Sequence, residues 1–121
     1  MKKILVVDDS PTIRVNAKYL IKNLGYEVAE AANGSEALKI IDSDAISLIL
    51  LDIHMPVLNG LEMLKKMEGI EKYEEIPIFI ISTDDAEERV SAAEKYGVKG
   101  WLHKPFKNKD VKTIVELYLE D

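Results

Sequence analysis

Two adjacent carboxylates follow directly after an apolar run near the start of the chain. Residues 4–10 read I-L-V-V-D-D-S, so Asp8 and Asp9 stand where a buried segment is expected to end. Burying charge beside such a run costs several kcal/mol unless another group compensates. Three further polar residues follow later apolar segments in the same way: Asp52, Ser82 and Lys104.

Three carboxylates brought together would repel one another, and one lysine cannot neutralise them. A hard divalent cation with oxygen ligands can, and Mg²⁺ is the usual choice beside phosphate. Each residue alone has a simpler interpretation, since an Asp-Asp pair after a strand is commonly a helix cap or a turn. The set as a whole favours a functional site, because mutually compensating charges in one cleft usually mark one.

The elements that would position these residues alternate between strand-like and helical patterns. Helical spacing of apolar residues follows each strand-like segment, and Gly25 and Gly97 end the first and fourth of the five expected helices. The polar segment Gly69–Glu75 is expected to be a surface connection. The strands are expected at Ile4–Val7, Glu27–Ala31, Ser47–Leu51, Ile76–Ile81 and Gly100–His103.

Strict alternation of strands and helices predicts a doubly wound α/β fold, with a parallel sheet and five helices on its two faces. The first, third and fourth strands are nearly all apolar, as central strands should be, whereas the second and fifth are mixed, as edge strands should be. Right-handed crossovers then favour the strand order 2-1-3-4-5. In that order, ligands bind at the carboxyl ends of the strands, between the first and third, where the three Asp residues would meet.

Composition and charge narrow the class of protein. The 121 residues suit one domain covering residues 1–121, and 47% hydrophobic with 31% charged residues argues against a disordered chain. A formal charge of −6 argues against a general nucleic-acid or membrane-surface binder. The absence of Cys excludes disulfides and thiolate metal sites. With no apolar stretch of about 18–20 residues, no membrane span is expected, and we expect a cytoplasmic protein.

The joint pattern resembles the receiver domains of two-component response regulators, over the whole chain. Such domains have the flavodoxin-like fold, and the sequence looks most similar to free-standing receivers of the chemotaxis CheY type. The matching stretches are V-V-D-D-S-P-T-I-R, A-N-G-x-E-A-L at Ala32–Leu38, L-L-D-I-H-M-P-V-L-N-G at Leu50–Gly60, I-I-S at Ile80–Ser82 and H-K-P-F at His103–Phe106.

The resemblance implies a role for each polar residue. Asp52 would accept a phosphoryl group from the phosphohistidine of a histidine kinase. Mg²⁺ would be held by Asp9, Asp52 and the backbone carbonyl of His54, with Asp8 acting through a bound water. Lys104 would pair with one phosphoryl oxygen, and Ser82 would donate a hydrogen bond to another. The protein would be a signalling switch that catalyses only its own phosphorylation and dephosphorylation.

The resemblance also implies a readout. Trp101 matches an aromatic residue of the fifth strand that turns inward when the residue matching Ser82 moves, and its alternative interpretation is an ordinary edge-strand aromatic. The face formed by the fourth helix, fifth strand and fifth helix would change its affinity for a downstream effector protein. The input partner would be a histidine kinase or a histidine phosphotransfer protein. Lys107, Lys109 and Lys112 add positive charge there, which a solvated helix start explains better.

Some positions vary within the pattern. Thr83 stands where Ala or Gly is common, and His54 and Asp84 occupy positions that influence dephosphorylation. The Lys104–Pro105 bond is a candidate for the cis geometry typical of receivers. A side-chain metal ligand role for His54 is the weaker alternative, because no second His or Cys stands nearby.

Three other functions share parts of this pattern. A pseudo-receiver would bind partners without phosphorylation, but here all five chemical positions are filled. A flavin-binding module would want Gly, Ser and Thr after the first strand. A phosphohydrolase of the haloacid-dehalogenase type would carry a second Asp two positions after Asp8, where this chain has Ser10.

Overall fold

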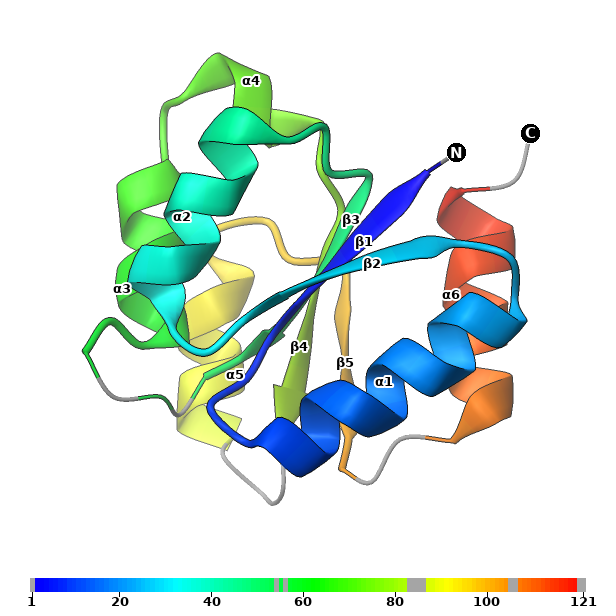
Figure 1. Cartoon of the computed structure of the whole chain (residues 1–121). Coiled ribbons are helices and arrows are strands. Elements are labelled where there is room, and N and C mark those ends of the chain that lie inside the picture. The colour runs from blue at the N-terminus through cyan, green and yellow to red at the C-terminus, as the bar shows by residue number, and fades with distance from the viewer. Residues whose placement is uncertain (1, 54, 56, 83–86, 105–106, 120–121) are drawn as a thin grey trace.

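The computed structural model of the chain describes residues 2–53, 55, 57–82, 87–104 and 107–119. Five parallel strands form one sheet in the order β2-β1-β3-β4-β5 (Figure 1). This confirms the predicted fold class and strand order. The strands are β1 (Lys3–Val7), β2 (Glu27–Ala31), β3 (Leu48–Asp52), β4 (Ile78–Ser82) and β5 (Gly100–His103).

The helices cover both faces of the sheet. On one face lie α2 (Gly34–Ser43), α3 (Gly60–Met67), the one-turn α4 (Glu71–Glu74) and α5 (Glu87–Glu94); on the other lie α1 (Pro11–Asn23) and α6 (Asn108–Tyr118) (Figure 1). The described part of the chain therefore contains one helix more than the five predicted. The addition is α4, which lies in the segment expected to be a surface connection and is fixed there by Tyr73, a buried core residue.

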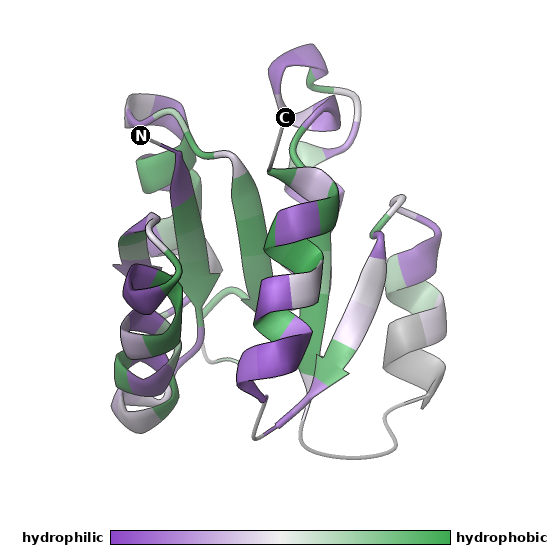
Figure 2. Cartoon of the chain, turned by 90° about the vertical axis from the view of Figure 1, so that its right-hand side faces the viewer, coloured by the Kyte–Doolittle hydropathy of each residue, from purple (hydrophilic) through white to green (hydrophobic). Residues whose placement is uncertain are grey.

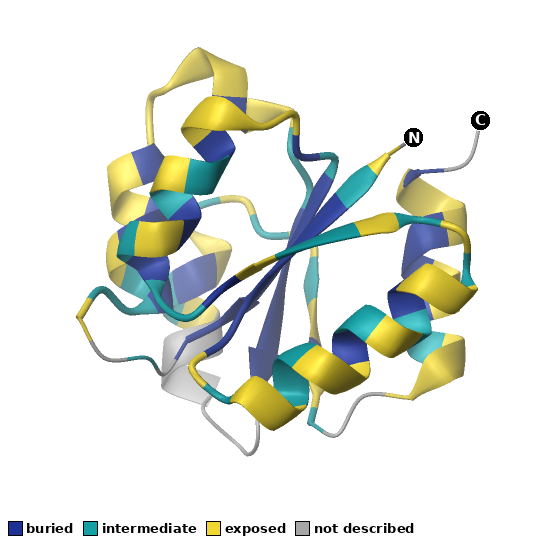
Figure 3. Cartoon of the chain, viewed as in Figure 1, coloured by how far each residue is buried: buried dark blue, intermediate teal, exposed yellow. Residues whose placement is uncertain are grey.

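Burial along the strands follows the order of the sheet. Every residue of β3 and β4 is buried, and only the first residue of β1 is not. In β2 a single residue is buried, Ala31, and in β5 only Leu102 (Figure 3). Apolar strands thus lie between helices that turn mixed faces outward (Figure 2). The contrast between apolar and mixed strands in the sequence identified the edges correctly, because only central strands are covered on both faces.

Side-chain caps start three of the helices, each supplied by a residue type that favours the helix N-cap position. Ser10 accepts a hydrogen bond from the amide of Ile13 at the start of α1. Asn59 and Glu62 form a reciprocal capping box at the start of α3. At α2, Asn33 caps the amide of Glu36, but the Glu36 carboxylate accepts from Ala32 instead of Asn33.

Three of the five predicted strands have boundaries that differ from the structure by one or two residues. The first begins at Lys3, and the third and fourth are shifted toward their carboxyl ends. The third strand includes Asp52, which pairs with Ile81, and the fourth includes Ser82, which pairs with His103. The fourth strand begins after Pro77, which has no amide to donate to the ladder. Asp52 and Ser82 are therefore the last residues of their strands, so the sheet itself fixes their backbones. Across the described ranges, no helix has both the length and the apolar character needed to cross a membrane.

Candidate functional site: a carboxylate cluster at the sheet edge

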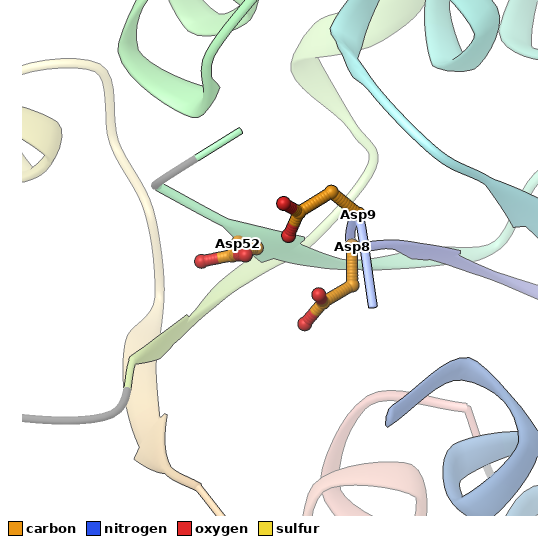
Figure 4. Close-up of side chains that lie close together, drawn as sticks. All are labelled: Asp8, Asp9 and Asp52. Atoms are coloured by element: carbon orange, nitrogen blue, oxygen red, sulfur yellow. The ribbon is translucent and has the colours of Figure 1, made fainter. Parts of the chain in front are cut away.

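The predicted carboxylates meet at the carboxyl edge of the sheet. Asp8 and Asp9 follow β1, and Asp52 ends the neighbouring β3 (Figure 4). One carboxylate oxygen from each lies within 4.8 Å of the other two. Asp8 and Asp52 are buried, whereas Asp9 is exposed. The cluster is therefore open to solvent on the Asp9 side and closed on the Asp8 side.

Asp8 is held at every polar atom. Its amide donates to the Ala31 carbonyl at 3.0 Å, and its carbonyl accepts from Arg14 Nη1 at 2.7 Å. Its Oδ1 accepts from the Ser10 amide at 2.9 Å. Its Oδ2 is buried without a hydrogen bond of ordinary geometry, and Lys104 Nζ is 2.6 Å away. Asp8 is thus a fixed anion whose compensation within the described residues comes from one ammonium group.

Lys104 is the cation of the cluster. Its Nζ lies 2.6 Å from Asp8 Oδ2 and 3.2 Å from Asp52 Oδ2, and its side chain is 10% exposed. Burial alone would lower the pKa of Lys104, but the short ionic contact with Asp8 and the negative charges of Asp52 and Asp8 outweigh it and raise that pKa above 10.5. At neutral pH, Lys104 is therefore a positive point charge beside Asp52 and has no role as a proton acceptor.

The backbone of Asp52 is fixed from its far side by the start of α3. The amide of Gly60 donates to the Ile53 carbonyl at 3.1 Å. A Cβ at position 60 would lie 2.6 Å from the Asp52 carbonyl oxygen, so only glycine allows this approach. The first residue of α3 thus packs against the backbone of Asp52 and holds this residue at the cluster.

Ser82 and Lys104 occupy neighbouring positions at the ends of the next two strands. The Lys104 amide donates to the Ser82 carbonyl at 2.7 Å, and Ser82 is buried. Trp101 pairs with Ile80, two residues before Ser82, so the two side chains point to the same face of the sheet. Trp101 is 48% exposed and occupies an outward position.

Several predicted features fall outside the described residues: the His54 carbonyl, Thr83, Asp84 and the Lys104–Pro105 bond. The three lysines near the start of α6 are described. Lys107, Lys109 and Lys112 are all exposed, and Lys112 lies 3.9 Å from Glu116 one turn along. This is the solvated helix start that the sequence favours.

The donor set fits a divalent metal ion. Three carboxylates carry three negative charges, and Lys104 neutralises one of them. Asp9 accepts no hydrogen bond from any described residue, so its oxygens are available, and carboxylate oxygens are what Mg²⁺ prefers. Both carboxylate oxygens of Asp8 already contact described groups, the Ser10 amide and Lys104 Nζ, whereas the Asp9 side of the cluster is exposed.

The sequence interpretation gave no role to Arg14 and Glu30. Arg14 stands in the stretch V-V-D-D-S-P-T-I-R, four residues after the Ser10 cap. A cation one turn into a helix that starts beside two carboxylates was a usable signal. No signal in the sequence pointed to Glu30, because its contact with Arg14 depends on how β2 pairs with β1.

Comparison with known proteins agrees with this geometry. The family model described as "Response regulator receiver domain" matches residues 4–116. Chemotaxis protein CheY1 of Helicobacter pylori is 40% identical over 119 residues, which cover 97% of this chain and 96% of the relative. A Chemotaxis protein CheY homolog of Campylobacter jejuni is 37% identical over 116 residues, which cover 94% and 89%.

Solved structures give the same answer. The chemotaxis response regulator CheY4 of Vibrio cholerae superposes with a TM-score of 0.88 at 34% identity, covering 98% of this chain and 99% of that one. Both the fold and the sequence therefore match over nearly the full length. The chain belongs to the response regulator receiver domain family and is a CheY-like phosphoacceptor signalling domain of a two-component system.

Proposed function

We propose that Asp52 accepts the phosphoryl group and that Mg²⁺ is required for the transfer. The observation that carries this proposal is the set of three carboxylate oxygens within 4.8 Å, with Lys104 Nζ 3.2 Å from Asp52 Oδ2. Asp52 is the member that ends a central strand, has its backbone packed against α3 and lies beside a fixed cation. A carboxylate in that position can act as the nucleophile toward a phosphorylated histidine.

The residues divide the work by their positions. Asp9 and Asp52 would hold the metal ion directly, with Asp8 acting through a water and the His54 carbonyl as a further ligand. When bound, Mg²⁺ supplies positive charge that screens the carboxylates from the incoming phosphoryl group and stabilises its oxygens. Lys104 would move from Asp8 toward a phosphoryl oxygen, a short distance since it already lies between both acids. Ser82, buried at the end of the neighbouring strand, would donate its hydroxyl to another oxygen.

The switch would run through the sheet face that Ser82 and Trp101 share. Phosphorylation adds about −1.5 to −2 charge and new acceptor oxygens. Movement of Ser82 toward them would free space beside Ile80 on that face, and Trp101 would turn into it. The face formed by α5, β5 and α6, called the output face below, would then change its affinity for an effector protein.

The partners follow from family membership at the level of class. A histidine kinase or a histidine phosphotransfer protein would supply the phosphoryl group, and an effector protein would bind the output face. The relatives named for chemotaxis make an effector of chemotaxis signalling the first to test. Turnover would be confined to the phosphoryl group on Asp52 itself. The cytoplasmic location stays a prediction.

The test is uptake of phosphate from a small donor. The protein is incubated with acetyl phosphate, with Mg²⁺ or with a chelator, and its intact mass is measured. We expect one added phosphate only with Mg²⁺, and none in Asp52→Asn. Wild type that gains no phosphate would leave the pseudo-receiver alternative, whereas family membership leaves no place for the flavin-binding or dehalogenase-type alternatives.

A further inference from the structure

The turn between β1 and α1 is held by a side chain that does not belong to the carboxylate cluster. Arg14 Nη1 donates to the Asp8 carbonyl oxygen at 2.7 Å, across six residues of chain. Asp8 is 0% exposed, so water cannot easily replace this donor. A buried carbonyl that loses its partner carries a desolvation cost, and the backbone around it tends to rearrange.

Arg14 is itself oriented from the neighbouring strand. Its Nε lies 3.3 Å from Glu30 Oε1 on β2, and its side chain is 19% exposed. The guanidinium is a rigid planar fork, so fixing Nε on Glu30 also fixes the direction of Nη1 toward Asp8. Glu30 has a second cation in Lys18, whose Nζ lies 3.7 Å from its other oxygen. Lys18 touches Glu30 without reaching the Asp8 carbonyl.

The Asp8 carbonyl and the Asp9 amide belong to one planar peptide unit. A donor that fixes the carbonyl therefore also fixes the plane from which the Asp9 backbone continues. Asp9 is the exposed member of the cluster, and no described residue donates a hydrogen bond to its carboxylate. Among the described residues, only its own backbone fixes its position relative to Asp52, and the bond from Arg14 restrains that backbone.

We propose that Arg14, held by Glu30, is a positioning residue for the divalent-cation site, acting through the Asp8–Asp9 peptide. This rests on the proposed function, in which Asp9 and Asp52 are the direct metal ligands. Arg14 makes no contact with the metal. It keeps the Asp9 carboxylate at the distance from Asp52 that one small cation can bridge.

Replacing Arg14 has two effects that change the affinity for Mg²⁺ in opposite directions: the loss of its charge and the loss of its hydrogen bond. Arg14 is a cation near three carboxylates, so removing its charge alone would strengthen the binding of Mg²⁺. Losing its hydrogen bond to the Asp8 carbonyl would loosen Asp9 and weaken the binding. The sign of the change in affinity therefore distinguishes the two effects without any measurement of phosphorylation.

The experiment is a Mg²⁺ titration by isothermal calorimetry on the full chain. We expect Arg14→Met to bind Mg²⁺ about tenfold more weakly, as removal of groups that hold a metal ligand in place generally does. Lys18→Met is the matched control, because it removes an equal charge from the same helix and from Glu30. It should bind Mg²⁺ as tightly as wild type or more tightly. Arg14→Lys keeps the charge without the fork and should also weaken binding; it carries the comparison if Arg14→Met fails to fold.

A second measurement needs no metal. Amide hydrogen exchange is followed in chelator at Asp9 and at Ser10, whose amide bonds Asp8 Oδ1. We expect faster exchange at both amides in Arg14→Met and unchanged exchange in Lys18→Met. Equal exchange in both variants, or Mg²⁺ binding by Arg14→Met as tight as by Lys18→Met, would overturn the inference. Wild type that binds no Mg²⁺ would instead contradict the proposed function, and exchange would still decide whether Arg14 holds the turn.

Discussion

The Lys104 ammonium lies 2.6 Å from Asp8 Oδ2, and both groups are removed from solvent, with side chains 10% and 0% exposed. Asp8 is a buried anion, and this contact supplies its compensating charge within the described residues. The same ammonium lies 3.2 Å from the proposed phosphoacceptor. One lysine thus compensates the buried Asp8 and would already be within reach of a phosphoryl group on Asp52.

Replacing Lys104 should destabilise the metal-free protein, because Asp8 would keep its buried charge without a cation. We expect Lys104→Met to lower the free energy of unfolding in chelator by about 2–4 kcal/mol. This is slightly less than the cost of about 3–5 kcal/mol generally found when a buried ion pair loses one partner. Urea unfolding measures it. The control is Lys72→Met, which removes an exposed pair with Asp42 and should cost no more than about 1 kcal/mol.

The pH dependence of this effect follows from the direction of the pKa shift. The pKa of Lys104 is raised in the folded state, so the stabilisation is fully present below pH 10.5 and is lost only as the pH rises through the higher folded value. The difference between wild type and Lys104→Met should therefore stay constant from pH 7 to 10. A difference that disappears near neutral pH would contradict the assignment of Lys104 as a fixed cation.

Replacing Asp9 should have the opposite effect on the metal-free protein. Asp9→Ala removes one of three mutually repelling carboxylates, and we expect it to raise the free energy of unfolding in chelator by about 1 kcal/mol. Mg²⁺ at 100 times its dissociation constant would add about 2.7 kcal/mol to wild type, so the order should reverse. Thermal unfolding of Asp9→Ala and wild type, in chelator and in Mg²⁺, measures the order of stability under each condition. A variant less stable than wild type in chelator would identify Asp9 as a structural cap instead.

The proposed link between Ser82 and Trp101 can be followed by fluorescence. Trp101 is the only Trp in the chain and is 48% exposed, so its emission should change when it turns inward. We expect a change with Mg²⁺ and a second change with beryllofluoride, a phosphoryl mimic. Ser82→Ala should keep the first and lose much of the second, since a coupling of about 1–3 kcal/mol is enough to shift the population visibly.

Ser43→Ala is the control for this experiment, because the Ser43 hydroxyl bonds carbonyls at the far end of α2. It should respond to beryllofluoride as wild type does. Equal beryllofluoride responses in wild type and Ser82→Ala would remove Ser82 from the switch and leave the chemistry at Asp52 untouched.

The short helix α4 is attached to α2 by polar contacts that depend on pH. Tyr73 donates its hydroxyl to Asp42 Oδ1, and Lys72 lies 3.1 Å from the same oxygen. The hydrogen bond from Tyr73, followed by that from Lys72, lowers the pKa of Asp42 below 3.8. A lowered folded pKa means that the stabilisation is present above pH 3.8 and is lost as the pH falls through the folded value.

We therefore expect Tyr73→Phe to raise the pKa of Asp42 toward 3.8, measured by NMR titration of its carboxyl group. The loss of stability in this variant should be present at pH 5 and should shrink below pH 3.8. Tyr96→Phe removes a hydroxyl that bonds no described residue, so it should leave Asp42 unchanged. An Asp42 pKa that is identical in wild type and Tyr73→Phe would show that the hydroxyl does not bond it.

Sequence reasoning predicted the sheet and the cluster because both depend on local patterns. The apolar runs of β3 and β4 identify central strands, and the ends of parallel strands share one edge, so Asp8, Asp9 and Asp52 had to meet. It missed α4, since a four-residue helix has too few residues to show a period and depends on Tyr73 reaching the core.

That Lys104 lies closer to Asp8 than to Asp52 could not be predicted either. Which acid a flexible lysine prefers depends on distances of a few tenths of an ångström, and these come from packing around the strand ends. The contact of Arg14 with the Asp8 carbonyl is of the same kind, because it needs the register that brings Glu30 beside Val6. Sequence patterns therefore predict where the site lies. The contacts between its side chains depend on how the strands and helices pack against one another.

The most direct test of the account is the position of the phosphoryl group. The protein is phosphorylated with acetyl phosphate and Mg²⁺, then reduced with sodium borohydride, which converts an aspartyl phosphate into homoserine. Peptide mass spectrometry then reads which residue has changed. We expect homoserine at position 52, and at neither position 8 nor position 9. Homoserine at Asp8 or Asp9 with Asp52 unchanged would contradict it.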